Sequence, residues 1–228
     1  MTYVIATPEP TSVPVIGSDS RFPVRRIFCI GRNYSDHAKE MGSTVDRSNP
    51  VFFTKPADAV VTDGANAPYP PATANLHHEV EMVVALARGG TGIDPHHANT
   101  LIFGHAVGLD LTRRDLQAQA KDKGLPWDTA KAFDHSAPIS AIRRVADGVP
   151  SGATELRLHV NGQLRQKTRL DAMIWSVPEI IAELSALFEL KAGDLIFTGT
   201  PAGVSALQPG DTLLAELDEL ARLHTLIC

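Results

Sequence analysis

Hydrophobic residues in this chain fall mainly into short runs bounded by Gly, Pro, Asn or Asp, which is the pattern of β-strands. Strands are predicted at residues 27–30, 51–54, 80–86, 106–111, 156–160 and 195–198. The run at 156–160 alternates apolar with polar residues, and Asn161-Gly162 follows it. Because Asn-Gly is the pair that a two-residue type I′ turn favours, this segment predicts a β-hairpin with a second, polar strand.

Three helices are predicted from capping residues and apolar spacing. One begins at the capping box Ser176-x-x-Glu179, and its buried stripe is expected to consist of Ile180, Ile181, Leu184 and Leu187. Two others are predicted at 112–123 and at about 35–41, each followed by a glycine. Helices this few do not alternate regularly with the strands, which argues against a doubly wound parallel sheet. The pattern therefore predicts an α+β fold centred on β-sheet.

The composition is that of an ordinary globular protein, with 43% hydrophobic and 21% charged residues in a chain of 228. Disordered and fibrous architectures are therefore excluded. The 17 glycines and 16 prolines suit a turn-rich β protein. Residues 1–23 are rich in Pro, Ser and Thr, and we expect an extended N-terminal arm there. Residues 24–228 contain neither a linker nor a fixed-period repeat, which predicts a single domain.

Charge and cysteine content narrow the expected partners and location. The net charge is −5 and no dense Lys/Arg run occurs, which argues against a nucleic-acid or anionic-membrane partner. No apolar run approaches the ~20 residues of a membrane span. The chain also lacks a basic-then-apolar signal pattern, so a cytoplasmic location is expected. The two cysteines cannot form a disulfide framework, and Cys29, within an apolar run, is expected in the core.

Acidic residues are the first candidates for chemistry. Glu79 and Glu81 are two apart on a predicted strand, so their side chains share one face. Two carboxylates that close repel each other, which is tolerable at a solvated edge but costly in a buried strand without a cation. Asp110 ends another apolar run and either caps the following helix or adds a third carboxylate. Three carboxylates would make an all-oxygen site suited to Mg²⁺, Mn²⁺ or Ca²⁺ rather than to zinc.

Two further pairs of residues lie three apart on predicted helices and so share a helix face. In the pair His37 and Glu40, a carboxylate on one imidazole nitrogen leaves the other nitrogen to accept a proton from water. Such a pair also arises by chance in ordinary sequences. Arg114 and Gln117 face either a cleft or the solvent. Lys131 lies among apolar and aromatic neighbours, and its ammonium is either buried in a cleft or extended to solvent.

Taken in chain order, these pieces resemble the fumarylacetoacetate hydrolase superfamily. The matching motifs are Gly31-Arg32-Asn33-Tyr34, His37-x-x-Glu40, Phe53-x-Lys55-Pro56, His78-Glu79-x-Glu81, Gly108-x-Asp110-x-Thr112-x-Arg114-Asp115-x-Gln117, Lys123-Gly124-x-Pro126-Trp127, Lys131 and Thr198-Gly199-Thr200-Pro201-x-Gly203-Val204. The resemblance extends from about residue 25 to residue 210, and it depends on the joint order and spacing of the motifs. It implies a mixed β-sandwich roll with a few short helices, which is usually a homodimer.

The resemblance also implies a site for a metal and a small-molecule 2-keto acid. It assigns metal ligation to Glu79, Glu81 and Asp110, with Mg²⁺ or Mn²⁺ as the expected cation and Ca²⁺ as a further candidate. Five residues are implied to line the substrate site: Arg32, Lys55, Arg114, Gln117 and Thr200. The expected partner is thus a small metabolite rather than a macromolecule.

A closer resemblance, in the N-terminal arm and at residues 173–179, is to bacterial fumarylpyruvate hydrolases of gentisate breakdown. It implies metal-dependent cleavage of a carbon–carbon bond in an acylpyruvate, most simply fumarylpyruvate to fumarate and pyruvate. His37 and Glu40 then activate water from a lid segment, and Lys131 is the catalytic lysine. One alternative is an oxaloacetate decarboxylase, another acylpyruvase or a related 2-keto acid lyase. The decarboxylase and the lyase differ from the hydrolase in that they need no attacking water. A metal-binding module without catalysis is the third hypothesis.

Overall fold

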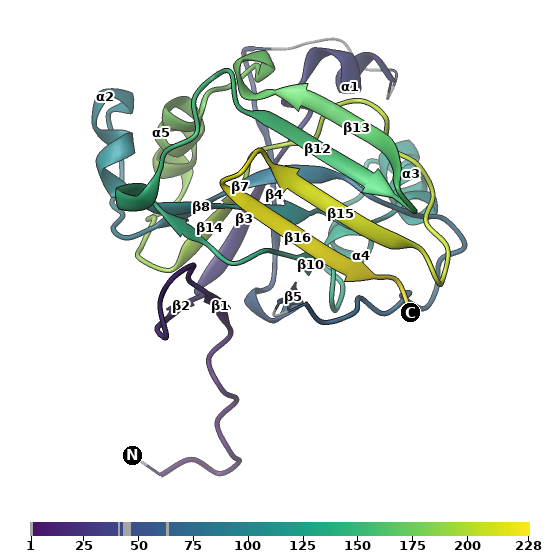
Figure 1. The fold of residues 1–228 in the computed structure, drawn as a ribbon, viewed down its shortest axis with the longest axis horizontal. Coiled ribbons are helices and arrows are strands. Elements are labelled where there is room, and N and C mark those ends of the chain that lie inside the picture. Colours follow the sequence, from purple (N-terminus) through teal and green to yellow (C-terminus); the bar gives the residue numbers. More distant parts are fainter. Residues whose placement is uncertain (1, 41, 43–46, 63) are drawn as a thin grey trace.

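A six-stranded mixed β-sheet lies at the centre of the molecule (Figure 1), in a computed structural model that describes residues 2–40, 42, 47–62 and 64–228. The strand order is β11-β8-β7-β14-β3-β4, in which β14 and β3 are parallel and the other neighbours antiparallel. The strands are β3 (Arg26–Gly31), β4 (Val51–Lys55), β7 (Val80–Leu86), β8 (Ile102–Leu109), β11 (Arg143–Arg144) and β14 (Asp194–Phe197). The runs predicted at 27–30, 51–54 and 80–86 lie in β3, β4 and β7, and the run predicted at 195–198 lies in β14 except for its last residue, Thr198.

The run predicted at 106–111 is displaced in the structure. It lies in β8, which begins four residues earlier because Ile102 pairs with Leu86 of β7. The strand ends at Leu109, since the N–H of Leu111 donates to the carbonyl of Ser136 instead of to β7. Asp110 consequently lies just outside the strand, where its side chain is free to face neighbouring elements.

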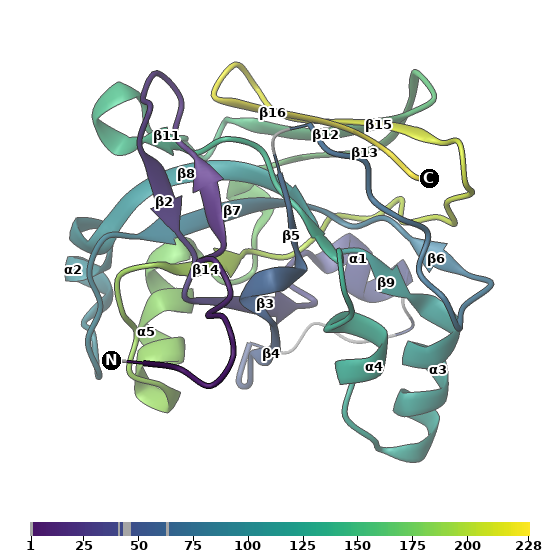
Figure 2. The same cartoon turned by 90° about the horizontal axis from the view of Figure 1, so that it is seen from below.

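A four-stranded antiparallel sheet packs against one face of the central sheet, and Figure 2 shows the two layers edge-on. Its order is β13-β12-β15-β16, formed by β12 (Glu155–Val160), β13 (Gln163–Arg169), β15 (Thr212–Leu217) and β16 (Ala221–Leu226). Leu156 and Leu158 of β12 share one buried cluster with Met82 and Val84 of β7. The predicted hairpin joins β12 to β13, and both Asn161 and Gly162 have the positive φ of a type I′ turn, 51° and 75°.

Short helices and turns surround these sheets. The helices are α1 (Ser35–Glu40), α2 (Pro95–Ala98), α3 (Arg114–Lys123), α4 (Asp128–Lys131) and α5 (Val177–Leu187). Short two-residue strands are β5 (Val60–Val61), β6 (Leu76–His77), β9 (Thr112–Arg113) and β10 (Ala137–Pro138). Sheets with a few short helices make this an α+β fold, as the sequence predicted. Among the described residues, no helix is both long and apolar enough to cross a membrane.

The predicted helices agree with the structure except at their ends. The capping box of Ser176 and Glu179 begins α5, and three of the four expected stripe residues are buried. Leu187 is the exception, with an exposed fraction of 65%, because it is the last residue of the helix. The helix predicted at 112–123 begins two residues late, since Thr112 pairs with His77 as part of β9. The residue expected to end α1, at position 41, lies outside the described residues.

The N-terminal segment differs from the arm expected at residues 1–23. Ser12–Pro14 (β1) and Arg21–Pro23 (β2) form an antiparallel hairpin. Its apolar side chains, Val13, Val15 and Phe22, belong to a second buried cluster on the other face of the central sheet, which also contains Cys29. Residues 2–10 are exposed throughout, and they extend away from the body in Figure 1. The short apolar pieces that the sequence shows are therefore part of a core, because the alternation of the hairpin buries them.

Deleting residues 2–10 should leave the free energy of unfolding unchanged, because these residues are exposed. Phe22→Ala should lower that free energy by about 3–5 kcal/mol, the usual cost of removing a buried aromatic side chain. Urea denaturation followed by circular dichroism measures both variants. A Phe22→Ala protein as stable as the wild type would contradict the packing of the hairpin.

Candidate active site

Three carboxylates converge where β7 begins and β8 ends. Glu79 precedes β7, Glu81 lies within it, and Asp110 follows β8, whose Gly108 is paired with Glu81. The N–H of Asp110 donates to the carbonyl of Glu79 at 2.8 Å, which holds the two strand ends together. The exposed fractions of Glu79, Glu81 and Asp110 are 5%, 2% and 0%. Of the two alternatives for the Glu-x-Glu pair, the structure therefore shows the buried one.

Three cations pair with these carboxylates. Lys131 of α4 bridges two of them, with its Nζ 2.7 Å from Glu79 Oε2 and 2.6 Å from Asp110 Oδ2. Lys55 of β4 lies 2.8 Å from Asp110 Oδ1, and Arg114 of α3 lies 2.5 Å from Glu79 Oε1. Asp110 thus faces two lysines and does not cap α3, whose N-terminus has no side-chain cap. The lysine predicted as either buried or solvated is buried.

Burial and neighbouring charges affect the pKa values of this cluster differently. Burial raises the pKa of Glu81 well above its usual value, and the charges of Asp110 and Glu79 raise it further. Burial also acts to raise the pKa of Glu79, but Lys131 and Arg114 more than offset it and lower that pKa. The pKa of Lys131 is raised although burial opposes this, because Asp110 and Glu79 stabilise its charge. Glu81 is thus the carboxylate that the protein's own cations stabilise least.

The donor set fits a divalent cation. Oxygens that share one Mg²⁺, Mn²⁺ or Ca²⁺ lie about 2.0–2.6 Å from it, and so within about 5 Å of one another. One oxygen each from Glu79, Glu81 and Asp110 meets that limit, since all three lie within 4.8 Å of one another. Asp110 Oδ1 is buried and accepts no hydrogen bond from the described residues, although Lys55 is close enough to form an ion pair. The carboxylates can therefore hold the kind of cation that the sequence predicted.

His37 and Glu40 form the expected pair on α1. His37 Nδ1 lies 3.3 Å from Glu40 Oε2, and both Glu40 oxygens accept from the N–H of Gly203, at 3.1 and 3.2 Å. Burial lowers the pKa of His37 and Arg114 lowers it further, while Glu79 and Glu40 act in the opposite direction. The neutral imidazole is therefore favoured near neutral pH. With Nδ1 directed at Glu40, Nε2 is the nitrogen left to accept a proton.

One cavity brings together nine of the eleven predicted site residues, in a volume of about 30 Å³, room for about two water molecules. Its predicted lining residues are Arg32, His37, Glu79, Glu81, Asp110, Arg114, Gln117, Lys131 and Thr200. The other two, Glu40 and Lys55, lie one contact away, behind His37 and Asp110. Lys55 is fully buried and donates to the carbonyls of Leu111 and Lys131, so it holds the backbone next to Asp110 and Lys131 in place.

Sequence reasoning missed several residues of this site. Gln166, from β13 of the other sheet, donates from Nε2 to Thr200 Oγ1 at 2.8 Å and accepts from His78 at 2.8 Å. It is the buried residue in an otherwise largely exposed strand, so no sequence pattern marks it. Lys121 also lines the cavity, and here a signal existed, because it continues the helical spacing of Arg114 and Gln117.

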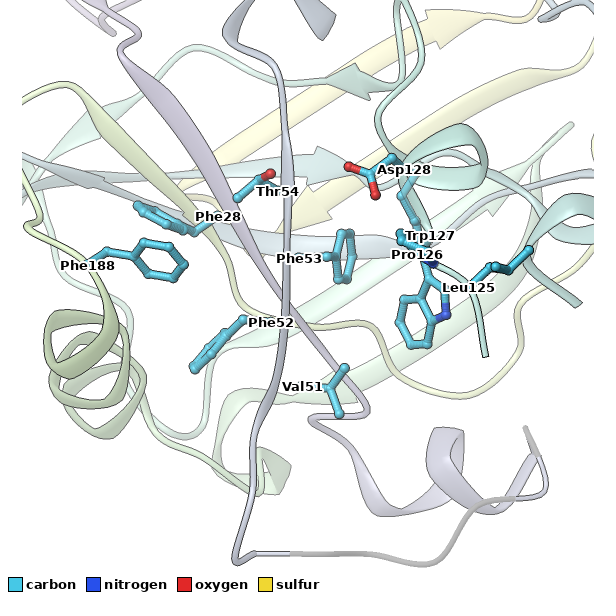
Figure 3. Close-up of a pocket in the computed structure, with 11 residues that line it drawn as sticks. Phe28, Val51, Phe52, Phe53, Thr54, Leu125, Pro126, Trp127, Asp128 and Phe188 are labelled. Atoms are coloured by element: carbon cyan, nitrogen blue, oxygen red, sulfur yellow. The ribbon is translucent and has the colours of Figure 1, made fainter. Parts of the chain in front are cut away.

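An aromatic cavity of about 360 Å³ adjoins the site (Figure 3). Phe53 of β4 and Trp127 line both cavities, and their ring centroids lie 5.9 Å apart. Figure 3 shows the two rings beside each other, with Phe28 and Phe188 further along the aromatic cavity. Lys131 also lines both cavities. The two aromatic rings therefore form a wall between the charged cavity and the apolar one.

Comparisons with known proteins agree with this geometry. A family profile described as fumarylacetoacetate (FAA) hydrolase C-terminal matches residues 26–227. The chain is 45% identical over 200 residues to the mitochondrial oxaloacetate tautomerase of Rattus norvegicus, covering 88% of this chain and 90% of that protein. It is 43% identical over 185 residues to the fumarylpyruvate hydrolase of a Ralstonia species, covering 80% of this chain and 96% of that protein.

Among solved structures, the fumarylpyruvate hydrolase of Pseudomonas aeruginosa in complex with Mn²⁺ and pyruvate superposes with a TM-score of 0.96. The two chains are 44% identical, and the match covers 99% of each. The protein therefore belongs to the fumarylacetoacetate hydrolase family, as the order of its motifs indicated. Its α+β class and its capacity for a divalent cation agree with this membership.

Mn²⁺ added to the chelator-treated protein should raise its Tm. A ligand that binds only the folded state at 100 times its Kd stabilises that state by about 2.7 kcal/mol. Glu81→Gln should abolish the rise, because it removes a ligand charge at constant size. In chelator this variant should be at least as stable as the wild type. The pKa of Glu81 is higher in the folded chain than in the unfolded one, so its ionisation opposes folding.

Differential scanning fluorimetry measures both effects. Glu183→Gln, which changes an exposed glutamate of α5, is the control and should keep the full Mn²⁺-induced rise. A normal rise in Glu81→Gln would contradict metal binding at the three carboxylates.

Proposed function

We propose that this protein hydrolyses a carbon–carbon bond in an acylpyruvate with the help of a divalent cation. The proposed substrate is fumarylpyruvate, cleaved to fumarate and pyruvate during degradation of aromatic compounds such as gentisate. The main supporting observation is that His37, with Glu40 behind it, lines the same cavity as the three carboxylates. Hydrolysis needs a base for water as well as a stabilised carbanion, and this cavity offers groups for both.

The proposed metal ligands are Glu79, Glu81 and Asp110. A divalent cation bound there supplies Lewis-acid stabilisation of the negative charge that develops on the 2-keto acid oxygens. Lys55 and Lys131 hold the ligand carboxylates in position through their ion pairs with Asp110. Arg114 does the same for Glu79. These contacts orient Asp110 and Glu79, and at Glu79 they lower the pKa and so favour the deprotonated form that metal binding requires.

His37 is the proposed general base. Its Nε2 removes a proton from water, and the resulting hydroxide attacks C4 of the acylpyruvate. Glu40 orients the imidazole and stabilises the imidazolium that forms, while its contacts with Gly203 N hold α1 against the loop after β14. The bond between C3 and C4 then breaks, its electron pair remains on the pyruvate half, and protonation at C3 completes pyruvate. The acyl half leaves as fumarate, so one water is consumed for each bond broken.

The amide of Gln117 and the positive charge of Lys131 are proposed to stabilise the oxyanion at C4. The three N–H groups of Lys131 themselves donate to Glu79, Asp110 and Thr112. Lys131 remains protonated, because its pKa is raised. Gln117 accepts from Arg114 through Oε1 at 2.6 Å, so its amide Nε2 is the end available to donate. Thr200 is positioned by Gln166 and is proposed to bind the substrate's keto acid end. Preorganised donors of this kind each typically contribute about 10²–10³ in turnover.

A second candidate function is the tautomerisation of oxaloacetate, between its keto and enol forms, or its decarboxylation. The specific observation in its favour is the 45% identity to the oxaloacetate tautomerase of Rattus norvegicus. Such reactions need the same stabilisation of charge on a 2-keto acid, but no attacking water. The role of His37 therefore distinguishes the two candidates.

A homodimer and a cytoplasmic location belong to the same proposal. In support of a dimer, β4 lies at one edge of the central sheet, next to the aromatic cavity, and an edge strand offers unpaired backbone groups to a second chain. The cytoplasmic location stays a prediction, because the relatives include both a bacterial and a mitochondrial protein.

With Mn²⁺ present, the wild type should turn over fumarylpyruvate faster than it turns over acetylpyruvate or oxaloacetate. His37→Ala should lower kcat/KM for fumarylpyruvate by about 10²–10⁴, the usual cost of losing a general base. Pyruvate release, followed with a coupled dehydrogenase, measures hydrolysis, while oxaloacetate tautomerisation and decarboxylation are followed by ultraviolet absorbance and CO₂ release.

His96→Ala, which changes an exposed histidine of α2, is the control and should retain full activity. Wild-type turnover confined to oxaloacetate would replace the hydrolase proposal by the second candidate. An undiminished rate of fumarylpyruvate hydrolysis in His37→Ala would show that the base is wrongly assigned.

The kcat/KM for hydrolysis should fall on the acid side through a group with a pKa below the ordinary histidine value of about 6.5. His37 must be neutral to accept a proton, and burial lowers its pKa. Glu40→Gln should shift this acid limb to still lower pH, because it removes a charge that favours the imidazolium. Rates of the wild type and of Glu40→Gln, measured from pH 4.5 to 8, give the acid limb of each protein. A profile that Glu40→Gln leaves in place, or moves upward, would count against the pair.

A further inference from the structure

Two cations at the mouth of the charged cavity differ from the cations deeper inside. Arg114 is fully engaged, with contacts to Glu79, Gln117 and His77. By contrast, Arg32 and Lys121 line the same cavity, and within the described ranges neither has a carboxylate partner. The cavity therefore has positive charge at its mouth that the protein itself does not neutralise.

Local structure directs these two cations toward the cavity. Lys121 is seven residues after Arg114 and four after Gln117, so the three lie on one face of α3. Its Nζ lies 5.4 Å from the ring centroid of Trp127, which supports the half-buried side chain without neutralising it. Arg32 follows β3 with a positive φ of 60°, a conformation that is uncommon for a residue with a side chain. Such strain is typical of residues held in place at functional sites.

The electrostatics of Lys121 point the same way. Burial lowers its pKa, and the nearby positive charges of Arg114 and Arg32 lower it further. These cations therefore lie close enough to repel one another, which an anion bound between them would relieve. The neighbouring aromatic cavity is lined by Asp128 as well as by Lys131, so it offers no comparable excess of positive charge. Figure 3 shows Asp128 next to Trp127 among the residues that line this cavity.

We propose that Arg32 and Lys121, with Trp127 beside them, form a subsite for a second carboxylate, so that the enzyme selects dianionic over monoanionic 2-keto acids. This inference rests on the proposed function for the position of the first carboxylate. The 2-keto acid end of the substrate binds at the three carboxylates and their cation. The carbon chain of the substrate then extends outward past Gln117 to Lys121. Bidentate binding by Arg32 and a point contact from Lys121 would hold the distal carboxylate.

Matched ligands test the subsite without requiring hydrolysis. 2-Oxoheptanedioate has the seven-carbon chain and both terminal carboxylates of fumarylpyruvate but no second keto group to attack, and 2-oxoheptanoate lacks the distal carboxylate. Calorimetry with the Mn²⁺-loaded protein gives a Kd for each, and their ratio is the preference for a dianion. Lys121→Met should reduce this preference about 10- to 100-fold, the usual effect of losing a hydrogen bond to a charged group.

Two controls separate charge from structure. Lys121→Arg should keep most of the preference, because it keeps the charge. Lys123→Met should keep all of it, since Lys123 is exposed two residues further along α3 and points away from the cavity face. Raising the salt concentration should reduce the wild-type preference, because ions screen partly exposed charges.

An unchanged preference in Lys121→Met, whether or not both ligands bind more weakly, would overturn the subsite. Failure of the proposed function is distinguishable from this result. If the wild type prefers the dianion but does not hydrolyse fumarylpyruvate, the subsite stands and the reaction is wrong. If it hydrolyses fumarylpyruvate but shows no preference for the dianion, the reaction stands and the subsite is wrong.

Discussion

The structure depends on the compensation of charge among three buried carboxylates. Taking a carboxylate out of water costs several kcal/mol unless cations and hydrogen bonds offset it. Lys131 meets most of this need by bridging Glu79 and Asp110, and Lys55 contacts the other oxygen of Asp110. The two lysines come from α4 and β4, outside the β7–β8 pair that supplies the carboxylates. The order of strands in the central sheet and the position of α4 are therefore conditions for the site to exist.

Compensation is incomplete at Glu81, so this carboxylate is the one at which a further positive charge would stabilise the site most. Its Oε2 accepts from the N–H of Gly199, so the chain stabilises the ionised form only in part. A divalent cation would supply the remaining charge. The same backbone segment continues to Thr200, which Gln166 holds, and to Gly203, which binds Glu40. One loop after β14 thus links the carboxylates, the proposed water-activating pair and the second sheet.

Within the described part of the chain, the cations that pair with carboxylates and those that do not lie in different parts of one cavity. Lys55, Lys131 and Arg114 are engaged with carboxylates and shape the interior. Arg32 and Lys121 lie at the mouth, where a partner from outside can approach them. The wall of Phe53 and Trp127 adds an apolar boundary, which strengthens electrostatic contacts by keeping water from one side. Selectivity and chemistry can consequently change independently in this fold.

The sequence by itself determined which residues share a face and which chemistry they offer. The two-residue spacing at the start of β7 places Glu79, just before the strand, near Glu81 within it. The Asn161-Gly162 turn defines one hairpin, and helical spacing joins His37 to Glu40. These features are local, so they follow from backbone geometry alone. The order of the motifs was also sufficient to indicate the family, because that order is a property of the chain and not of its fold.

Only the tertiary structure decided between alternatives that depend on distant partners. From its local sequence Asp110 is expected to cap a helix and Lys131 to extend to solvent, but α4 brings Lys131 within 2.6 Å of Asp110. The N-terminal hairpin resembles an extended arm until the central sheet offers its apolar residues a face to cover. Gln166 carries no signal at all, because its partners His78 and Thr200 come from other elements. Burial and charge pairing arise between segments far apart in the chain, and no local pattern encodes them.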